Sequence, residues 1–246
     1  VWDMDKITPF VMPYESKANA AKIYMCGDST MDSYGYTNKN AADPEYARIS
    51  GWGEEFGKYF DTNKAVVENY ALSGSSAREF YNYSALWKSV KPLLKKGDYV
   101  LIQFGHNDQG EESSYDSAEE SKKEYKYYLN LMAGEAAAAG AIPVFVTSIN
   151  RLEYVNGVFT ETLGGYPEEM KKLAEDLKIP VIDIHAETAQ WLTQIGENEA
   201  MQYFRYGRDG SDYTHLNTMG ARKIAAMVID KIKSDSALAG LKALLK

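Results

Sequence analysis

Ser29, Asp212 and His215 are of the residue types that nucleophilic catalysis combines. A serine hydroxyl is a weak nucleophile until a base takes its proton, and imidazole is the side chain best suited to that task near neutral pH. Asp212 precedes His215 by three residues. A single turn of backbone can therefore hold the carboxylate against Nδ1–H and leave Nε2 facing the serine. The residue types and their spacing predict a Ser–His–Asp triad.

A second set of groups could stabilise the negative charge that such a reaction creates. Attack on a carbonyl produces an oxyanion, which requires hydrogen-bond donors that are placed in advance. The backbone N–H of Ser29, the backbone N–H of Gly74 and the side-chain amide of Asn107 are suitable donors. Gly74 also has no side chain that could block a close approach. We predict that these three groups form the oxyanion hole.

Each of these residues also has an ordinary structural explanation. Ser29 could be the N-cap of a helix, because serine is a preferred capping residue. Asn107 could be a turn former after a strand, and Asp212 with His215 could be a surface pair on a loop. The catalytic interpretation is favoured because all the signals occur together, in the order that one mechanism requires.

A metal site is the other chemical interpretation of this region. His106 and Asp108 flank Asn107 and could bind a metal ion together with Asp212 and His215. The sequence has no dense cluster of His and Asp ligands of the kind that metal sites use. We therefore expect no metal and no cofactor, and we interpret His106 as a buried, hydrogen-bonded support residue.

The elements that must position these residues follow an alternating pattern of strands and helices. Short apolar runs, closed by Gly or polar turn residues, indicate strands. Alternation with helical segments indicates one domain, residues 1–246, with a parallel sheet covered on both faces. The carboxyl ends of parallel strands share one edge, so the polar clusters that follow the strands should converge there. The expected strands are 22–26, 65–70, 98–104, 142–149 and 179–184.

The remaining segments are expected to be helices, loops and an extended N-terminal arm. The arm covers residues 1–20 and includes an edge strand around 10–12. Helices are predicted at 52–60, 77–83, 85–94, 117–139, 166–177, 186–195, 198–204, 218–233 and 236–245. Long polar loops are predicted at 31–51, 107–116, 150–165 and 205–216.

Composition narrows the range of partners. The net charge of −8 and the pI near 5.1 argue against binding to nucleic acid and to an anionic membrane surface. No stretch approaches the roughly 20 apolar residues of a membrane span. Cys26 is the only cysteine, so no disulfide forms within the chain and a small buried hydrophobe is expected there. Because the chain begins with Val1 rather than Met, we expect a trimmed or mature form. We also expect an extracellular protein, with a cytoplasmic location left open, and a monomer.

Four ordered blocks of this sequence resemble the SGNH, or GDSL, hydrolases. The blocks are Gly27-Asp28-Ser29, Gly74, Gly105-His106-Asn107-Asp108 and Asp212-Tyr213-Thr214-His215. The runs GDSTM, NYALSGSSAREF, QFGHND and DYTHLN resemble rhamnogalacturonan acetylesterases and related pectin-directed carbohydrate esterases. The resemblance implies a three-layer α/β/α sandwich with a five-stranded parallel sheet of flavodoxin-like order.

The same resemblance implies roles for individual residues and a substrate. Ser29 would be the nucleophile, His215 the base and Asp212 its orienting partner, with oxyanion donors from Gly74 and Asn107. The reaction would remove O-acetyl groups from an acetylated plant cell-wall polysaccharide or oligosaccharide, most simply rhamnogalacturonan or another pectin. Ser75 departs from the pattern, because many relatives carry Arg directly after the second-block glycine.

Four alternative functions remain at this point. A lipase or thioesterase of the same superfamily would need an apolar trough, whereas the loops predicted at 31–51, 107–116 and 150–165 are mostly polar. An acetylxylan esterase would use the same chemistry on another sugar backbone. A sugar-binding module would not need a Ser–His–Asp set. Binding of flavin or nucleotide is disfavoured because no Gly-rich phosphate loop follows the first strand.

Overall fold

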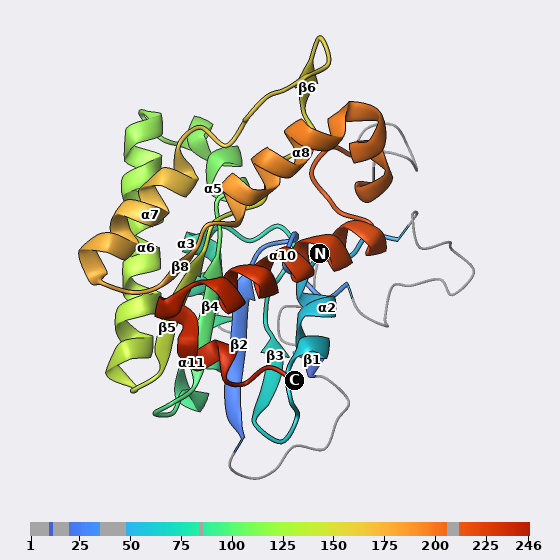
Figure 1. Cartoon of the computed structure of the whole chain (residues 1–246). Helices are drawn as coiled ribbons and strands as arrows, with labels where there is room; N and C mark the ends of the chain where they lie inside the picture. Colours follow the sequence, from blue (N-terminus) through green and yellow to red (C-terminus); the bar gives the residue numbers. More distant parts are fainter. Residues whose placement is uncertain (1–9, 12–19, 35–47, 84–85, 206–211) are drawn as a thin grey trace.

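A six-stranded sheet lies at the centre of the computed structural model, which describes residues 10–11, 20–34, 48–83, 86–205 and 212–246 (Figure 1). The order across the sheet is β1-β3-β2-β4-β5-β8. The strands are β1 (Phe10–Val11), β2 (Ala21–Gly27), β3 (Ala65–Asn69), β4 (Tyr99–Gln103), β5 (Ile142–Val146) and β8 (Val181–Ile182). All pairings are parallel except that of β1 with β3. The five parallel strands have the flavodoxin-like order 2-1-3-4-5, which confirms the predicted fold class.

The central strands are buried on both faces, as parallel strands between helical layers must be. Along β2, Ile23 and Met25 pack into one hydrophobic core, while Tyr24 and Cys26 pack into the other. This alternation follows from the two-residue period of a strand. Cys26 is fully buried, as predicted.

Helices cover both faces of the sheet and complete three layers (Figure 1). One layer contains α3 (Ala77–Asn82), α4 (Trp87–Val90) with η4 (Lys91–Leu93), α6 (Ala118–Ala138) and α7 (Tyr166–Leu177). The other contains α2 (Gly53–Phe56) with η3 (Gly57–Tyr59), α8 (Ile184–Ala200) with η6 (Met201–Tyr203), α10 (Thr218–Ser234), η7 (Ser236–Leu238) and α11 (Ala239–Lys242). Within the described part of the chain, no helix is both long and apolar enough to cross a membrane.

Two predictions about the segments after strands were wrong. Residues 107–116 are mainly helical, because α5 (His106–Gly110) and η5 (Glu112–Ser114) follow β4 directly. The strand predicted at 142–149 ends at Val146. Its partner β8 is only two residues long, because Asp183 caps the N-terminus of α8 by accepting the Ala186 N–H at 3.1 Å. A strand without a partner to pair with cannot continue.

The predicted loop at 150–165 contains a hairpin that the sequence analysis missed. Strands β6 (Tyr154–Val155) and β7 (Val158–Phe159) pair antiparallel around Asn156 and Gly157, whose φ angles are 53° and 78°. Two successive residues with positive φ are typical of the two-residue turns that match strand twist. The hairpin projects from the body of the molecule (Figure 1).

Other boundaries differ in smaller ways. The range of α8 contains two helical stretches separated at Gly196, whose φ of 72° and ψ of 170° are not helical, so the break between the helices predicted at 186–195 and 198–204 is present. The helix predicted at 52–60 changes from α to 3-10 geometry after Phe56. The edge strand predicted around 10–12 is present as β1, while most of the arm 1–20, most of the loop 31–51 and part of the loop 205–216 lie outside the described residues.

Candidate active site

The five predicted site residues lie in segments that leave the carboxyl edge of the sheet or fold over it. Ser29 follows β2 by two residues, and Gly74 and Asn107 lie in the segments after β3 and β4. Asp212 and His215 lie in residues 212–217, the triad loop, which leads into α10. Two backbone hydrogen bonds hold the loop: the Arg205 N–H donates to the His215 carbonyl at 2.8 Å, and the Leu152 N–H donates to the Tyr213 carbonyl at 2.7 Å.

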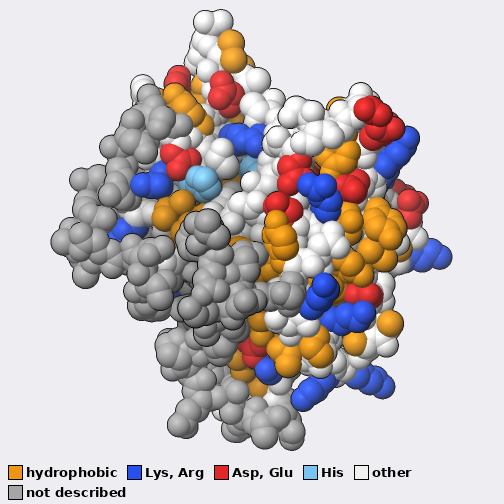
Figure 2. Space-filling model, turned by 180° about the vertical axis from the view of Figure 1, so that it is seen from behind, with side chains coloured by type: hydrophobic (Ala, Val, Ile, Leu, Met, Phe, Trp, Pro, Cys, Tyr) orange, Lys and Arg blue, Asp and Glu red, His pale blue; other side chains and the backbone are white. Residues whose placement is uncertain are grey.

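A continuous chain of hydrogen bonds joins Ser29, His215 and Asp212. Nε2 of His215 lies 2.9 Å from Ser29 Oγ, and Nδ1 lies 3.0 Å and 3.1 Å from the two carboxylate oxygens of Asp212. A carboxylate can only accept, so Nδ1 carries the proton and Nε2 is left to accept the serine proton. Ser29 is 5% exposed, whereas the His215 side chain is 29% exposed. Figure 2 shows histidine side chains at the surface, beside basic and acidic ones.

Asp212 is held in place by its own loop. Its Oδ1 accepts the backbone N–H of Thr214 at 3.2 Å and that of His215 at 3.0 Å. Burial acts to raise the pKa of Asp212, but the hydrogen bonds from His215 outweigh it and leave the pKa below its ordinary value. The carboxylate is therefore ionised at neutral pH. Arg205, which the sequence analysis did not single out, places Nη1 at 3.9 Å from Asp212 Oδ2.

The three predicted oxyanion donors are available in the same region. Among the described residues, the N–H groups of Ser29 and Gly74 have no hydrogen-bond acceptor. Gly74 has φ +84°, a conformation that favours glycine. The Asn107 amide donates to the Ser75 carbonyl at 3.0 Å, and a primary amide has a second N–H to offer. The bond to Ser75 also ties the Gly74 segment to α5.

A buried polar network supports the segment that carries Ser29. Asp28 accepts the backbone N–H and the hydroxyl of Thr30 at 2.9 Å and 2.8 Å, and its other oxygen lies 3.3 Å from His106 Nδ1. Burial acts to raise the pKa of Asp28, but the bonds from His106 and Thr30 leave it lowered. Gln103 continues the network by donating to Thr30 Oγ1 and accepting from Trp52 Nε1. His106 is thus buried and hydrogen-bonded, as the sequence predicted.

The residues weighed as metal ligands have other partners. His106 contacts Asp28, and Asp108 Oδ1 accepts the Ala77 N–H at 2.9 Å. Burial raises the pKa of Asp108 to about 8, so this carboxyl group is mostly protonated at neutral pH. In the part of the chain that the structure describes, no three His, Cys, Asp or Glu residues are grouped to hold a metal ion.

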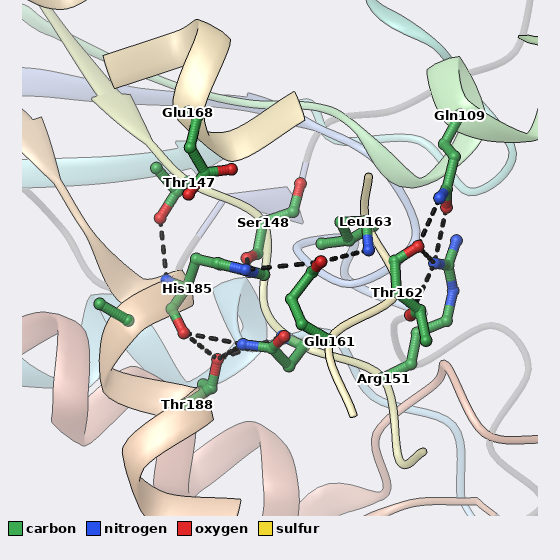
Figure 3. Close-up of polar contacts among 12 residues, drawn as sticks. Gln109, Thr147, Ser148, Arg151, Glu161, Thr162, Leu163, Glu168, His185 and Thr188 are labelled. Atoms are coloured by element: carbon green, nitrogen blue, oxygen red, sulfur yellow. Dashed lines mark hydrogen bonds and ion pairs between the residues drawn. The ribbon is translucent and has the colours of Figure 1, made fainter. Parts of the chain in front are cut away.

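Three residues near the site were missed by the sequence analysis because their contacts connect distant segments. Nη1 of Arg151 donates to Gln109 Oε1 at 2.7 Å and to Thr162 Oγ1 at 3.2 Å (Figure 3). Gln109 also donates to the Thr162 carbonyl. The only sequence signal for these residues was the charge of Arg151 shortly after an apolar run. Loops often contain charged residues, so this signal did not indicate a functional role.

Comparison with known proteins identifies the family. The family model of GDSL-like lipases and acylhydrolases matches residues 23–228. The rhamnogalacturonan acetylesterase RhgT of Bacillus subtilis is 34% identical over 86% of this chain and 89% of its own length.

Two solved structures extend the comparison. Protein YxiM of Bacillus subtilis has a TM-score of 0.74 at 27% identity, covering 87% of this chain and 56% of that one. The acetylxylan esterase Axe2 of Geobacillus stearothermophilus has a TM-score of 0.58 at 17% identity, covering 88% of this chain and 97% of that one, and supports the fold alone. The family model spans most of the chain, including Ser29, Gly74, Asn107, Asp212 and His215, and this protein therefore belongs to the GDSL-like lipase/acylhydrolase family.

Proposed function

We propose that this protein is a serine esterase that removes O-acetyl groups from a plant cell-wall polysaccharide of the rhamnogalacturonan type. The observation that carries the proposal is the hydrogen-bond chain from Ser29 Oγ through His215 to Asp212. A Ser–His–Asp set with correctly placed donors performs acyl transfer without a metal or cofactor. Similarity to RhgT, a rhamnogalacturonan acetylesterase, supports the substrate class.

In the first half of the reaction, Ser29 Oγ attacks the acetyl carbonyl carbon while its proton passes to Nε2 of His215. Asp212 stabilises the resulting imidazolium and keeps Nδ1 as the donor. The carbonyl oxygen becomes an oxyanion that accepts from the Ser29 and Gly74 N–H groups and from the Asn107 amide. When the intermediate collapses, the bond to the sugar oxygen breaks, and that oxygen takes the proton from Nε2.

The second half repeats these steps with water. The acetyl group is now esterified to Ser29, and His215 takes a proton from a water molecule that attacks the same carbonyl. Collapse of the second intermediate returns the proton to Ser29 Oγ and releases acetate. The balance is one water consumed and one ester bond cleaved.

The surroundings of the site fit a small acyl group on a sugar. The described residues near Asn107 and Arg151 include the polar side chains of Gln109, Glu111 and Thr162. A longer acyl chain gains about 0.8 kcal/mol per CH₂ only where an apolar wall receives it. Since the polymer lies outside the cell, we also propose that the protein acts there. We further propose that it is a monomer and that residues 1–246 form one domain.

Acetate release separates this proposal from its alternatives. Acetylated rhamnogalacturonan, acetylated xylan and acetylated homogalacturonan are incubated with the wild type and with Ser29→Ala. We expect the highest kcat/KM on rhamnogalacturonan and no release by the variant. Higher kcat/KM on xylan would replace the proposed substrate with that of an acetylxylan esterase.

Acyl length provides a second test, using 4-nitrophenyl esters. We expect kcat/KM to be highest for acetate, lower for butyrate and close to undetectable for octanoate. A profile that rises towards octanoate would reject the carbohydrate esterase and favour the lipase.

A further inference from the structure

Arg151 lies between the two segments that carry the proposed catalytic groups. On one side its guanidinium contacts Gln109 at 2.7 Å, and Gln109 is on α5 together with Asn107. On the other side its neighbour Leu152 donates to Tyr213 of the triad loop at 2.7 Å. These contacts tie Arg151 to the segments that carry Asn107 and His215, although it takes no part in the acyl transfer itself.

Within the part of the chain that the structure describes, the contacts of Arg151 use one of its three nitrogens. Nη1 donates to Gln109 Oε1, to Thr162 Oγ1 and, at 3.5 Å, to the Thr162 carbonyl. Among the described residues, Nε and Nη2 have no acceptor, and neither is among the buried polar atoms without a partner. These two nitrogens remain accessible, and together they form the edge of a guanidinium that binds a carboxylate with two parallel hydrogen bonds.

The charge of Arg151 is not neutralised by its direct contacts. All its hydrogen-bond partners are neutral oxygens, and no ion pair joins it to a described carboxylate. Glu161 is near in the chain, but its carboxylate accepts the Leu163 N–H and lies 3.6 Å from His185 Nε2 (Figure 3). Burial lowers the pKa of Arg151, while Asp28 and Glu161 act in the opposite direction. An arginine that is partly desolvated without a counterion favours an incoming anion.

From this geometry we propose that Arg151 binds a carboxylate of the sugar chain, so that the site selects acetyl esters on acidic polysaccharide over those on neutral polysaccharide. This inference rests on the proposed function, because it concerns the groups next to the acetyl ester at the same site. The chain carries a net charge of −8 and repels a polyanion at long range. A local unpaired cation offsets that repulsion where the substrate must lie.

The test compares two substrates and two enzymes. Acetylated rhamnogalacturonan oligosaccharides are used with free carboxylates and after methyl esterification of those carboxylates. A charge-assisted bidentate contact predicts that the wild type loses about 10- to 100-fold in kcat/KM on esterification. Arg151→Gln should lose a similar factor on the free acid, mainly through KM, and should not distinguish the two substrates. Equal rates of the wild type on both substrates would overturn the proposal.

Two controls separate carboxylate binding from a structural role. Activity on 4-nitrophenyl acetate, which has no carboxylate, should be the same in Arg151→Gln and wild type, whereas equal losses on both substrates would mean that Arg151 only holds the loop in place. Arg78 lies on α3, and Arg78→Gln removes the same charge from its ion pair with Glu111. It should keep the wild-type preference, and loss of the preference in this variant would point to net charge instead.

A direct binding measurement tests whether Arg151 binds a sugar carboxylate, even if the proposed esterase function is wrong. Calorimetry with unacetylated trigalacturonate, at constant ionic strength, needs no turnover. We expect binding by wild type, about 10- to 100-fold weaker binding by Arg151→Gln, and no comparable binding of sodium acetate. Equal affinity of both proteins for trigalacturonate, or equal binding of acetate, would reject the sugar-acid site. Failure to release acetate from any polysaccharide, with this binding intact, would reject only the proposed esterase function.

Discussion

Replacing Asp212 by Asn should reverse the proton arrangement of the triad while leaving the fold intact. Asp212 Oδ1 accepts the N–H groups of Thr214 and His215 at 3.2 Å and 3.0 Å. In the Asn variant the amide oxygen must take this position, because only an oxygen can accept these bonds. The NH₂ group then replaces Oδ2, the oxygen nearer to Nδ1 of His215 at 3.0 Å, and it can only donate. The amide oxygen, 3.1 Å from Nδ1, is already occupied by the two backbone N–H groups.

The size of the effect follows from this exchange. With an NH₂ donor facing Nδ1, the neutral imidazole carries its proton on Nε2, which then faces Ser29 Oγ at 2.9 Å as a donor and not as an acceptor. In a Ser–His–Asp enzyme the wrong tautomer costs about 10⁴ in kcat, or roughly 5.5 kcal/mol of transition-state stabilisation. We expect a loss of this size in kcat on 4-nitrophenyl acetate at pH 7, with KM nearly unchanged.

A matched variant makes the result interpretable. Asp235→Asn makes the same chemical change at the exposed N-cap of η7, where Asp235 accepts the Ala237 N–H at 2.8 Å. It should retain wild-type kcat, and both variants should keep the wild-type Tm within a few degrees. If Asp212→Asn retains more than about a tenth of wild-type kcat, the orienting role derived from the structure is refuted.

Three further predictions address the neighbouring groups. Ser29→Ala and His215→Ala should each lower kcat by several orders of magnitude, and the double variant should be little worse than either one; additive losses would separate their roles. Asn107→Ala should lower kcat by roughly 10²–10³ with little change in KM, and a rise in KM alone would make it a binding residue. Because burial raises the pKa of Asp108 to about 8, the folded state holds its proton over a range where the unfolded chain loses it. The free energy of unfolding should therefore fall as pH rises from about 4 to 8, by up to about 1.4 kcal/mol per unit from this group. Asp108→Asn should remove this part of the pH dependence of the unfolding free energy. Urea unfolding of both proteins at several pH values measures it, and an equal pH dependence in wild type and variant would contradict the argument.

Local sequence signals were sufficient to predict the parallel sheet and the segments of the chain that carry the site residues. A buried strand needs only a short apolar run, and β2 and β4 lie within one residue of their predicted bounds. Asp212 and His215 are three residues apart, so their contact is fixed within one turn of backbone. The Asn156–Gly157 turn was also a local signal, since its pattern is typical of a hairpin; it was overlooked in a segment interpreted as a loop.

Contacts between distant segments depended on the tertiary structure. His106 and Asp28 are 78 residues apart, and Arg151 and Gln109 are 42 apart, so no periodicity along the chain pairs them. The end of β5 depends on where β8 stops, and the raised pKa of Asp108 depends on its burial. Propensity and turn chemistry act over a few residues, whereas desolvation and charge pairing depend on what the whole fold packs around a group. For that reason the residues of the proposed triad and oxyanion hole could be predicted from the sequence. The environment of Arg151 could be determined only from the folded chain.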